Sequence, residues 1–180
     1  TGSPVDGKTC NDDCHTSYTL NSGSAAFSIS APASYTSGET LNMIVSFGSS
    51  TTAKHGFELT ALDANNSSVG TFSNPDANTQ VSTNYIKHTS AGSSQSGNAS
   101  WNVQWTAPTD GQGVVTFYAA GNEANGDFTN QGDHIYTTTE QISAAAATPT
   151  ATPTPTTSEC EPEAITLDTK KLNLKLGEGK

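Results

Sequence analysis

Apolar and polar residues alternate along much of the first 142 positions of the chain. The alternation is clearest in three early runs, at 27–31, 41–47 and 57–61. A period of two sends successive side chains to opposite faces, which is the pattern of a half-buried β-strand. Further strands are expected at 81–87, 99–106, 113–121 and 134–142. No stretch shows convincing helical periodicity.

Clusters of turn-forming residues separate these runs, among them Thr36–Glu39 and Asn74–Asp76. Seven or eight short strands at this spacing predict an all-β fold, an antiparallel β-sandwich of about 120 residues. We expect it to occupy residues 26–143, after a loop-rich segment over 1–25. Trp101, Val103 and Trp105 fall on one face of a strand, so one of the two indoles is expected at the centre of the core.

The chain changes character after the predicted sandwich. Residues 144–158 are rich in Ala, Thr and Pro, which predicts an extended linker with a solvated backbone. Residues 159–180 then contain an alternating run, Leu172–Leu176. So short a segment cannot bury a core of its own. It is expected to be either a strand donated to another subunit or the start of a truncated immunoglobulin-like domain.

Composition and charge narrow the class of protein. The 180 residues are 32% hydrophobic and 13% charged, with a net charge of −10 and no arginine. With so few cations, we expect no nucleic-acid partner. No apolar run is long enough to cross a bilayer, so no membrane span is expected. The chain begins at Thr1 without a methionine, from which we expect a removed export signal and an extracellular or cell-surface location.

The motif with the most chemical content is Cys10-Asn11-Asp12-Asp13-Cys14-His15. Two cysteines followed directly by a histidine are typical of covalent haem attachment, where the thiols form thioethers and the imidazole binds the iron. The usual spacing leaves two residues between the cysteines, and this chain has three. The motif predicts Cys10 and Cys14 as thioether residues of one haem c and His15 as its proximal iron ligand. The main alternative is a short Cys10–Cys14 disulfide loop. A zinc site would need further ligands, and the chain has no other Cys/His pair at ligand spacing.

The body of the chain resembles a bacterial reelin-like domain, of the Reeler type called choice-of-anchor V. The resemblance rests on the Cys-His segment and on the following motifs in order: Gly56–Ala61, Lys87–Gly92, Trp101–Pro108, Val115–Asn122 and Gly132–Tyr136. It covers roughly residues 1–142. The resemblance implies an exported immunoglobulin-like β-sandwich, and it suggests His15 and His88 as an axial pair on haem c.

Other histidines also fit the position of the distal ligand. His88 ends a predicted strand and precedes a Ser/Gly-rich loop, which favours it, while His134 is the second choice and His55 the third. Met43, the only methionine, is expected in a strand interior. Two histidine ligands leave no open position on the iron, so such a site moves single electrons. This interpretation predicts an extracellular monohaem c-type cytochrome for electron transfer, with other redox proteins as partners.

Several features leave alternatives open. Residues 122–133 are rich in oxygen ligands, so calcium is a second candidate cofactor, although their spacing is not that of an EF-hand. Cys160 has no evident partner. A strand donated from residues 159–180 would make the chain a homo-oligomer or a haem-bearing filament. No catalytic motif is recognised, so no enzyme activity is expected. The alternative function is a non-enzymatic adhesion or anchor module with a Cys10–Cys14 disulfide.

Overall fold

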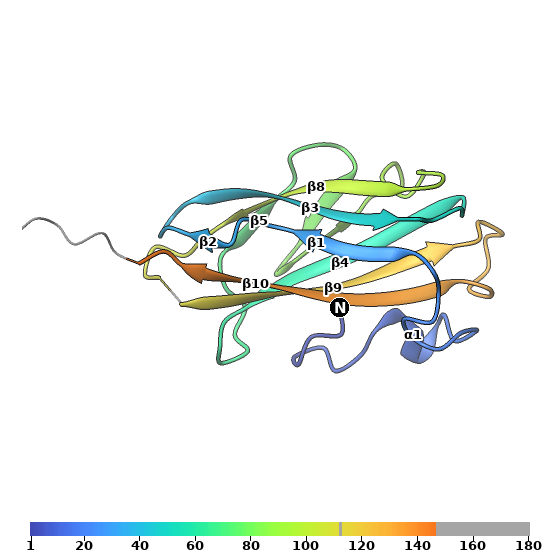
Figure 1. Cartoon of the computed structure of the whole chain (residues 1–180), viewed down its shortest axis with the longest axis horizontal. Helices are drawn as coiled ribbons and strands as arrows, with labels where there is room; N and C mark the ends of the chain where they lie inside the picture. The colour runs from blue at the N-terminus through green and yellow to red at the C-terminus, as the bar shows by residue number, and fades with distance from the viewer. Residues whose placement is uncertain (112, 147–180) are drawn as a thin grey trace, which may run out of the picture. The chain divides into compact units, whose positions relative to one another are not determined.

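Two β-sheets pack face to face in the residues described by this computed structural model, 1–111 and 113–146 (Figure 1). The chain divides into two units, Thr1–Ala146 and Ala147–Lys180, and the sandwich lies in the first. The elements, in chain order, are α1 (Cys10–Asp13), β1 (Ala26–Ser30), β2 (Ser34–Tyr35), β3 (Thr40–Gly48), β4 (Lys54–Leu62), β5 (Thr71–Ser73), β6 (Thr79–Ser82), β7 (Tyr85–His88), β8 (Ala99–Thr106), β9 (Val114–Ala124) and β10 (His134–Ala144).

The smaller sheet has the order β1-β3-β8-β5, and the larger has the order β2-β10-β9-β4-β7-β6. All ladders are antiparallel except the short one between β2 and β10. In the larger sheet, β9 pairs along its length with both β4 and β10. The predicted all-β sandwich is therefore confirmed, and β4 and β9 form the middle of the sheet that positions the site.

Alternation along the strands separates the core from the surface. In β3 the side chains of every second residue from Leu41 to Phe47 are buried, and in β8 those of Trp101, Val103 and Trp105 are buried. Met43 lies opposite Val103 in the ladder, and both face the other sheet. The expectation that Met43 is a strand-interior residue is met.

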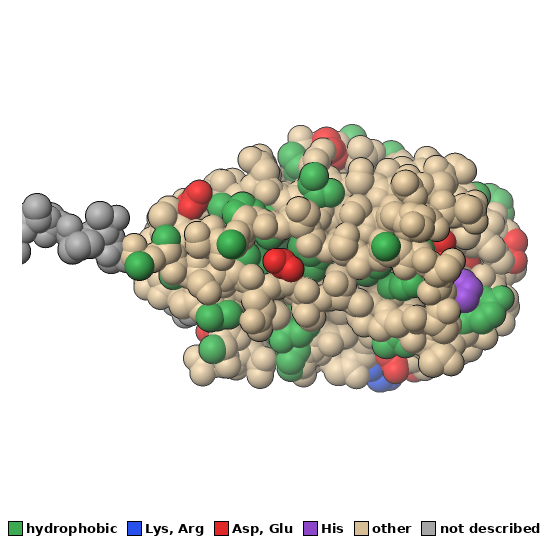
Figure 2. Space-filling view, in the orientation of Figure 1, with side chains coloured by type: hydrophobic (Ala, Val, Ile, Leu, Met, Phe, Trp, Pro, Cys, Tyr) green, Lys and Arg blue, Asp and Glu red, His purple; other side chains and the backbone are tan. Residues whose placement is uncertain are grey.

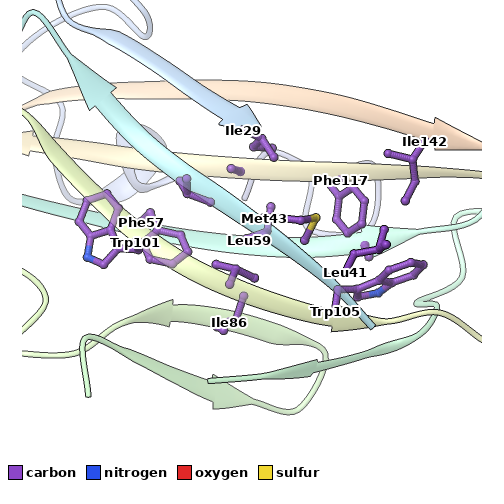
Figure 3. Packing of buried hydrophobic residues seen from close by; sticks show 14 of the residues in the cluster. Ile29, Leu41, Met43, Phe57, Leu59, Ile86, Trp101, Trp105, Phe117 and Ile142 are labelled. Carbon is purple, nitrogen blue, oxygen red and sulfur yellow. The ribbon is translucent and has the colours of Figure 1, made fainter. Parts of the chain in front are cut away.

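Both indoles belong to the core, rather than one. Trp101 packs against Phe57 with ring centroids 4.8 Å apart, and Trp105 meets Phe117 edge-on at 5.2 Å, towards the opposite end of the cluster (Figure 3). Each indole also keeps a hydrogen bond, because its Nε1–H donates to a backbone carbonyl oxygen, Gly92 for Trp101 and Val69 for Trp105. Burial of the rings therefore leaves no unpaired indole donor.

The single strand predicted over 81–87 is wrong, because the chain forms two strands there. Residues Thr79–Ser82 and Tyr85–His88 make the antiparallel hairpin β6–β7. Thr83 takes a positive φ of 54°, which reverses the chain between them. This turn was not recognised, since neither Thr83 nor Asn84 is a glycine or proline. Strands β2 and β5 were not predicted, because two or three residues give no readable period.

The described surface is polar but sparsely charged. On the face seen in Figure 2, hydrophobic and acidic side chains are scattered over a surface made mostly of backbone and of other side chains. Within residues 1–111 and 113–146, no helix is long and apolar enough to cross a membrane.

Candidate functional site

The N-terminal segment, residues 1–25, lies against the larger sheet on the side away from the smaller one (Figure 1). Asn21 fixes its far end to the edge of β10. The backbone N–H of Asn21 donates to the carbonyl oxygen of Ile135 at 2.9 Å, and the side-chain Oδ1 of Asn21 accepts from the backbone N–H of Thr137 at 2.8 Å. The segment predicted to hold haem is therefore an ordered layer on the sandwich.

Helix α1 is a single turn, and it contains the cysteine motif. Thr9 caps it: the Thr9 hydroxyl accepts from the N–H of Asn11, and the Asp12 carboxylate accepts from the N–H of Thr9 in return. Cys10 and Cys14 are four positions apart, so they share one face of the turn. The N–H of His15 donates to the carbonyl oxygen of Cys10 at 2.9 Å, which continues the turn to the histidine. This short helix was not predicted, because four residues show no period.

Both cysteines of the motif are free and exposed. Although Cys10 is exposed as a residue, neighbouring groups partly shield its thiol from water; this raises the pKa of Cys10 above its ordinary value, and the charge of Glu58 adds to the effect. A raised pKa keeps the thiol protonated at neutral pH, which slows its attack on other sulfur atoms. Because both residues are free and exposed, their side chains are accessible to a reaction partner, although the raised pKa makes Cys10 a slow nucleophile on its own.

A cavity of about 310 Å³ lies between the N-terminal segment and strands β4, β7 and β9. Its volume is at the lower end of the range of about 300–1,000 Å³ that is usual for ligand pockets. Three of the predicted site residues line it: Cys10, His15 and His88. The other lining residues are Thr1, Gly56, Phe57, Glu58, Lys87, Ala120, Gly121 and Asn122. The structure thus brings the two histidines of the suggested axial pair to one pocket.

The His88 ring is held by the backbone of β4. Its Nδ1 lies 3.0 Å from the amide nitrogen of Phe57 and 3.1 Å from the carbonyl oxygen of the same residue. These are alternatives, because Nδ1 either accepts from the N–H or carries a proton and donates to the carbonyl. In the second form, Nε2 has a free lone pair, which is the state that a metal-bound histidine requires.

His15 has a comparable partner. Its Nδ1 lies 2.9 Å from Oδ2 of Asp133, whose side chain is 3% exposed. The nitrogen is itself buried and makes no aligned hydrogen bond in the described residues. Histidines that bind metals through Nε2 commonly place Nδ1 against a carboxylate or a backbone carbonyl oxygen. Both predicted iron ligands have such an oxygen.

A second polar cluster fastens the segment beside the pocket. Asp6 accepts hydrogen bonds from the hydroxyl groups of Thr1 and Tyr85 and is 2.9 Å from the amino group of Thr1. Although burial raises the pKa of Asp6, these hydrogen bonds and the amino group together lower it to about 2. The hydrogen bond to Asp6 raises the pKa of Tyr85 to about 12. Tyr85 begins β7, so the cluster ties the N-terminal segment to the strand of His88.

The other candidate ligands lie elsewhere. His134, the second choice, is stacked on Tyr18 with ring centroids 4.0 Å apart and does not line the cavity. His55 is buried, with Nδ1 at 2.8 Å from the carbonyl oxygen of Gln95 and Nε2 at 2.8 Å from Oγ of Ser50. Its two ring nitrogens are therefore already paired. Neither residue is brought to Cys10 and His15.

In the oxygen-rich segment 122–133, side-chain oxygens accept hydrogen bonds from nearby backbone N–H groups. Oδ1 of Asp127 accepts from the N–H of Thr129, and Oδ1 of Asn125 accepts from that of Asp127. Among the residues that the structure describes, no three His, Cys, Asp or Glu side chains are grouped to hold a metal ion. Calcium binding stays a prediction. Cys160, the tail 159–180 and all but the first residues of the linker 144–158 lie outside the described residues.

Three of the four residues predicted to hold haem c line the pocket, and Cys14 is not among its lining residues. Cys10 and His15 come from the N-terminal segment and His88 from the end of β7, and Gly56 beneath the His88 ring leaves room for that ring. Lys87 is the one basic residue of lysine or arginine type among the lining residues. Sequence reasoning missed Gly56, Lys87 and Asp133, because only the pairing of distant strands gives these residues their role.

Comparison with known proteins agrees with the architecture. A search of curated proteins finds no match. The family model of the Reeler domain matches residues 8–139, which includes the cysteine motif, the whole of strands β1 to β9 and part of β10. The match covers most of the chain, and the chain therefore belongs to the Reeler domain family.

Proposed function

We propose that the chain serves as a non-enzymatic module of an extracellular or cell-surface protein. The Reeler domain suggests an extracellular or adhesion-type module, and membership of this family supports the proposal. A polar surface with few charges is in keeping with an exported β-domain. The module acts through the pocket beneath its N-terminal segment.

For the ligand of that pocket, we infer a single haem c used for electron transfer. One observation favours it: Cys10, His15 and His88, chosen from the sequence for their chemistry, line the same cavity. The thiols of Cys10 and Cys14 would attach the group, and the two imidazoles would hold its iron. A haem ligated in this way supplies one-electron chemistry, since it leaves no open position for oxygen.

Other residues of the chain would orient the two histidines, hold Cys10 in place and set the charge around the pocket. The carbonyl oxygen of Phe57 and the carboxylate of Asp133 face Nδ1 of the two histidines, which leaves Nε2 of each for the ligand. Cys10, beside the cavity, is held by the capped turn of α1. Glu58 and Lys87, opposite each other in the ladder of β4 and β7, set the charge at the rim.

The second candidate is an adhesion or anchor module without a cofactor, in which Cys10 and Cys14 form a disulfide. The position of the two exposed thiols on one face of a single turn favours it. So small a loop closes little chain, and its bond would add little stability. In this case the pocket would be a by-product of the way the N-terminal segment packs.

Assembly into a filament is a further part of the proposal. The larger sheet ends at β2 and β6 and the smaller at β1 and β5, and such edges can accept an added strand. The alternating Leu172–Leu176 has the pattern of that strand. Deletion of residues 159–180 should abolish polymers in size-exclusion chromatography and electron microscopy. Polymers of unchanged length after the deletion would refute strand donation.

The haem proposal is tested by producing the whole chain in cells that export it and attach haem c. We expect a red protein whose intact mass is higher by one haem and whose Soret band survives denaturation and acid-acetone extraction. A Cys10→Ala/Cys14→Ala variant should lose the colour after such extraction. A colourless wild-type chain with a Cys10–Cys14 disulfide would instead support the cofactor-free module.

A further inference from the structure

Asp133 is a buried carboxylate beside His15, which lines the pocket. The whole residue is 2% exposed to solvent. Oδ1 accepts the backbone N–H of Asn125 at 3.0 Å, while Oδ2 lies 2.9 Å from Nδ1 of His15 and 3.3 Å from Nδ2 of Asn122. A carboxylate shielded from water is costly unless its oxygens are paired. Here Oδ1 accepts a hydrogen bond from the loop backbone, and Oδ2 faces His15 and the side-chain amide of Asn122.

The backbone around this pair is fixed from both sides. Ser17, two positions after His15, accepts the N–H of Gly132 on its hydroxyl oxygen at 2.9 Å. Asn130 donates its side-chain N–H to the carbonyl oxygen of Cys14 at 2.7 Å. Residues on either side of His15 are thus bonded to the loop that presents Asp133. The contact between the two side chains is a product of the fold and not a chance approach on the surface.

The chemistry of the pair determines which nitrogen of His15 is free. A neutral imidazole has one N–H, and an ionised carboxylate only accepts hydrogen bonds. Oδ2 therefore favours the form of His15 that has its proton on Nδ1 and a lone pair on Nε2. The N–H is not yet aligned with Oδ2. Such bonds are often poorly aligned before the ligand binds and become shorter and straighter afterwards.

We propose that Asp133 is the positioning residue of the pocket: it selects the Nδ1–H form of His15 and so presents Nε2 to the ligand. Asp133 itself does not touch the ligand. The identity of that ligand as haem rests on the proposed function, but the effect of Asp133 on the imidazole does not. The proposal can therefore be tested without any cofactor.

The substitution Asp133→Asn gives the sharpest test. Oδ1 of the new amide would still accept the N–H of Asn125, which leaves the amide nitrogen facing Nδ1 of His15. That nitrogen can only donate, so Nδ1 must become the acceptor and the proton must move to Nε2. Oδ1 of Asn122, which is buried without a partner in the described residues, can accept the other amide hydrogen after a flip of the Asn122 side chain. The hydrogen bond to the loop backbone is thus kept, while the proton of His15 moves from Nδ1 to Nε2.

The measurement is the ring nitrogen-15 chemical shifts of His15 in the full chain made without haem, at a pH where the imidazole is neutral. We expect mainly Nδ1–H in the wild type and mainly Nε2–H in Asp133→Asn. The matched control is Asp127→Asn, which removes a charge from the same loop at a residue whose carboxylate bonds to Thr129, and it should leave the shifts unchanged. Mainly Nε2–H in the wild type, or equal shifts in the wild type and Asp133→Asn, would overturn the proposal.

A second measurement uses the haem-loaded chain. Asp133→Asn should keep the mass of the attached haem but convert a low-spin spectrum into one with a high-spin fraction, because Nε2 of His15 is protonated. An unchanged low-spin spectrum would contradict the role of Asp133 while leaving the haem proposal intact. If no haem is attached to the wild type, the haem proposal fails, and the nitrogen shifts still decide the role of Asp133.

Discussion

The imidazole of His88 lies so close over Gly56 that a Cβ on this glycine would come within 2.6 Å of Cε1 of the ring. Real Cβ atoms do not approach other atoms so closely. The absence of a side chain at position 56 therefore decides where His88 can lie. The ring reaches the backbone of β4 at Phe57, and so the floor of the pocket, only because this residue is a glycine.

Gly56→Ala should expel the His88 ring from the pocket. The new methyl group overlaps the ring, so the hydrogen bond at Nδ1 must break, and we expect destabilisation of about 1–3 kcal/mol from overpacking. Chemical denaturation measures the loss, and the nitrogen-15 shifts of His88 report the displacement. Gly48→Ala is the matched control, since its Cβ would meet its nearest neighbours at 3.9 Å and above. Equal effects of the two substitutions would contradict this account of Gly56.

A buried polar network in the sandwich should be sensitive to loss of one hydroxyl group. Oγ of Ser50 donates to Oε1 of Glu123 at 2.6 Å and contacts Nε2 of His55 at 2.8 Å, while the hydroxyl of Tyr136 donates to Oε2 of Glu123 at 2.7 Å. Ser50→Ala would leave one carboxylate oxygen buried without this donor. We expect a cost of about 1–3 kcal/mol in the free energy of unfolding.

Urea denaturation of Ser50→Ala beside Ser28→Ala measures that cost. Ser28 makes an exposed hydrogen bond with Ser46 across β1 and β3. Its loss should change stability by no more than about 0.5 kcal/mol. A Ser50→Ala protein as stable as this control would show that Glu123 does not depend on the serine.

The attachment of the N-terminal segment should weaken at both extremes of pH. Because the pKa of Asp6 is lowered from 3.8 to about 2, its contribution is complete above pH 3.8 and is lost as the pH falls through about 2. The pKa of Tyr85 is raised from 10.0 to about 12, so its contribution is complete below pH 10.0 and is lost as the pH rises through about 12.

Proteolysis within residues 1–9, followed by mass spectrometry, measures this attachment across the pH range. Tyr85→Phe removes the bond to Asp6 and should make cleavage faster at neutral pH and less dependent on pH. Tyr118→Phe removes the hydroxyl of a tyrosine in β9 that does not contact Asp6, and this variant should be cleaved like the wild type. Cleavage of Tyr85→Phe at the wild-type rate would show that Asp6 does not fasten the segment.

Much of the sandwich could be predicted from the sequence, because burial on one face of a strand imposes alternation. This holds for β3 and β8, where each second residue is apolar and buried. It fails for β6 and β7, because Thr83 makes a turn with a positive φ that its residue type does not announce. The local alternation of residues shows which face of a strand is buried. It does not locate a turn that contains neither Gly nor Pro.

The site could be predicted only in part. The residue types of Cys10, Cys14 and His15 and their order suggested chemistry directly. His88 could be preferred over His134 only weakly, since the difference lies in which strand ends near α1. The roles of Gly56 and Asp133 depend on the β4–β7 pairing and on the β9–β10 loop folding back onto residues 14–17. Contacts between residues so far apart in sequence cannot be recognised from the local sequence pattern.

The pocket formed by Cys10, His15 and His88 is most directly tested by the optical spectrum of the exported, haem-loaded chain with His88→Ala beside His134→Ala. Both substitutions remove one histidine, but only His88 lines the cavity. We expect a low-spin bis-histidine spectrum in the wild type and in His134→Ala, and a high-spin fraction in His88→Ala. A wild-type chain that holds no haem, or a His88→Ala spectrum identical to that of the wild type, would contradict the account.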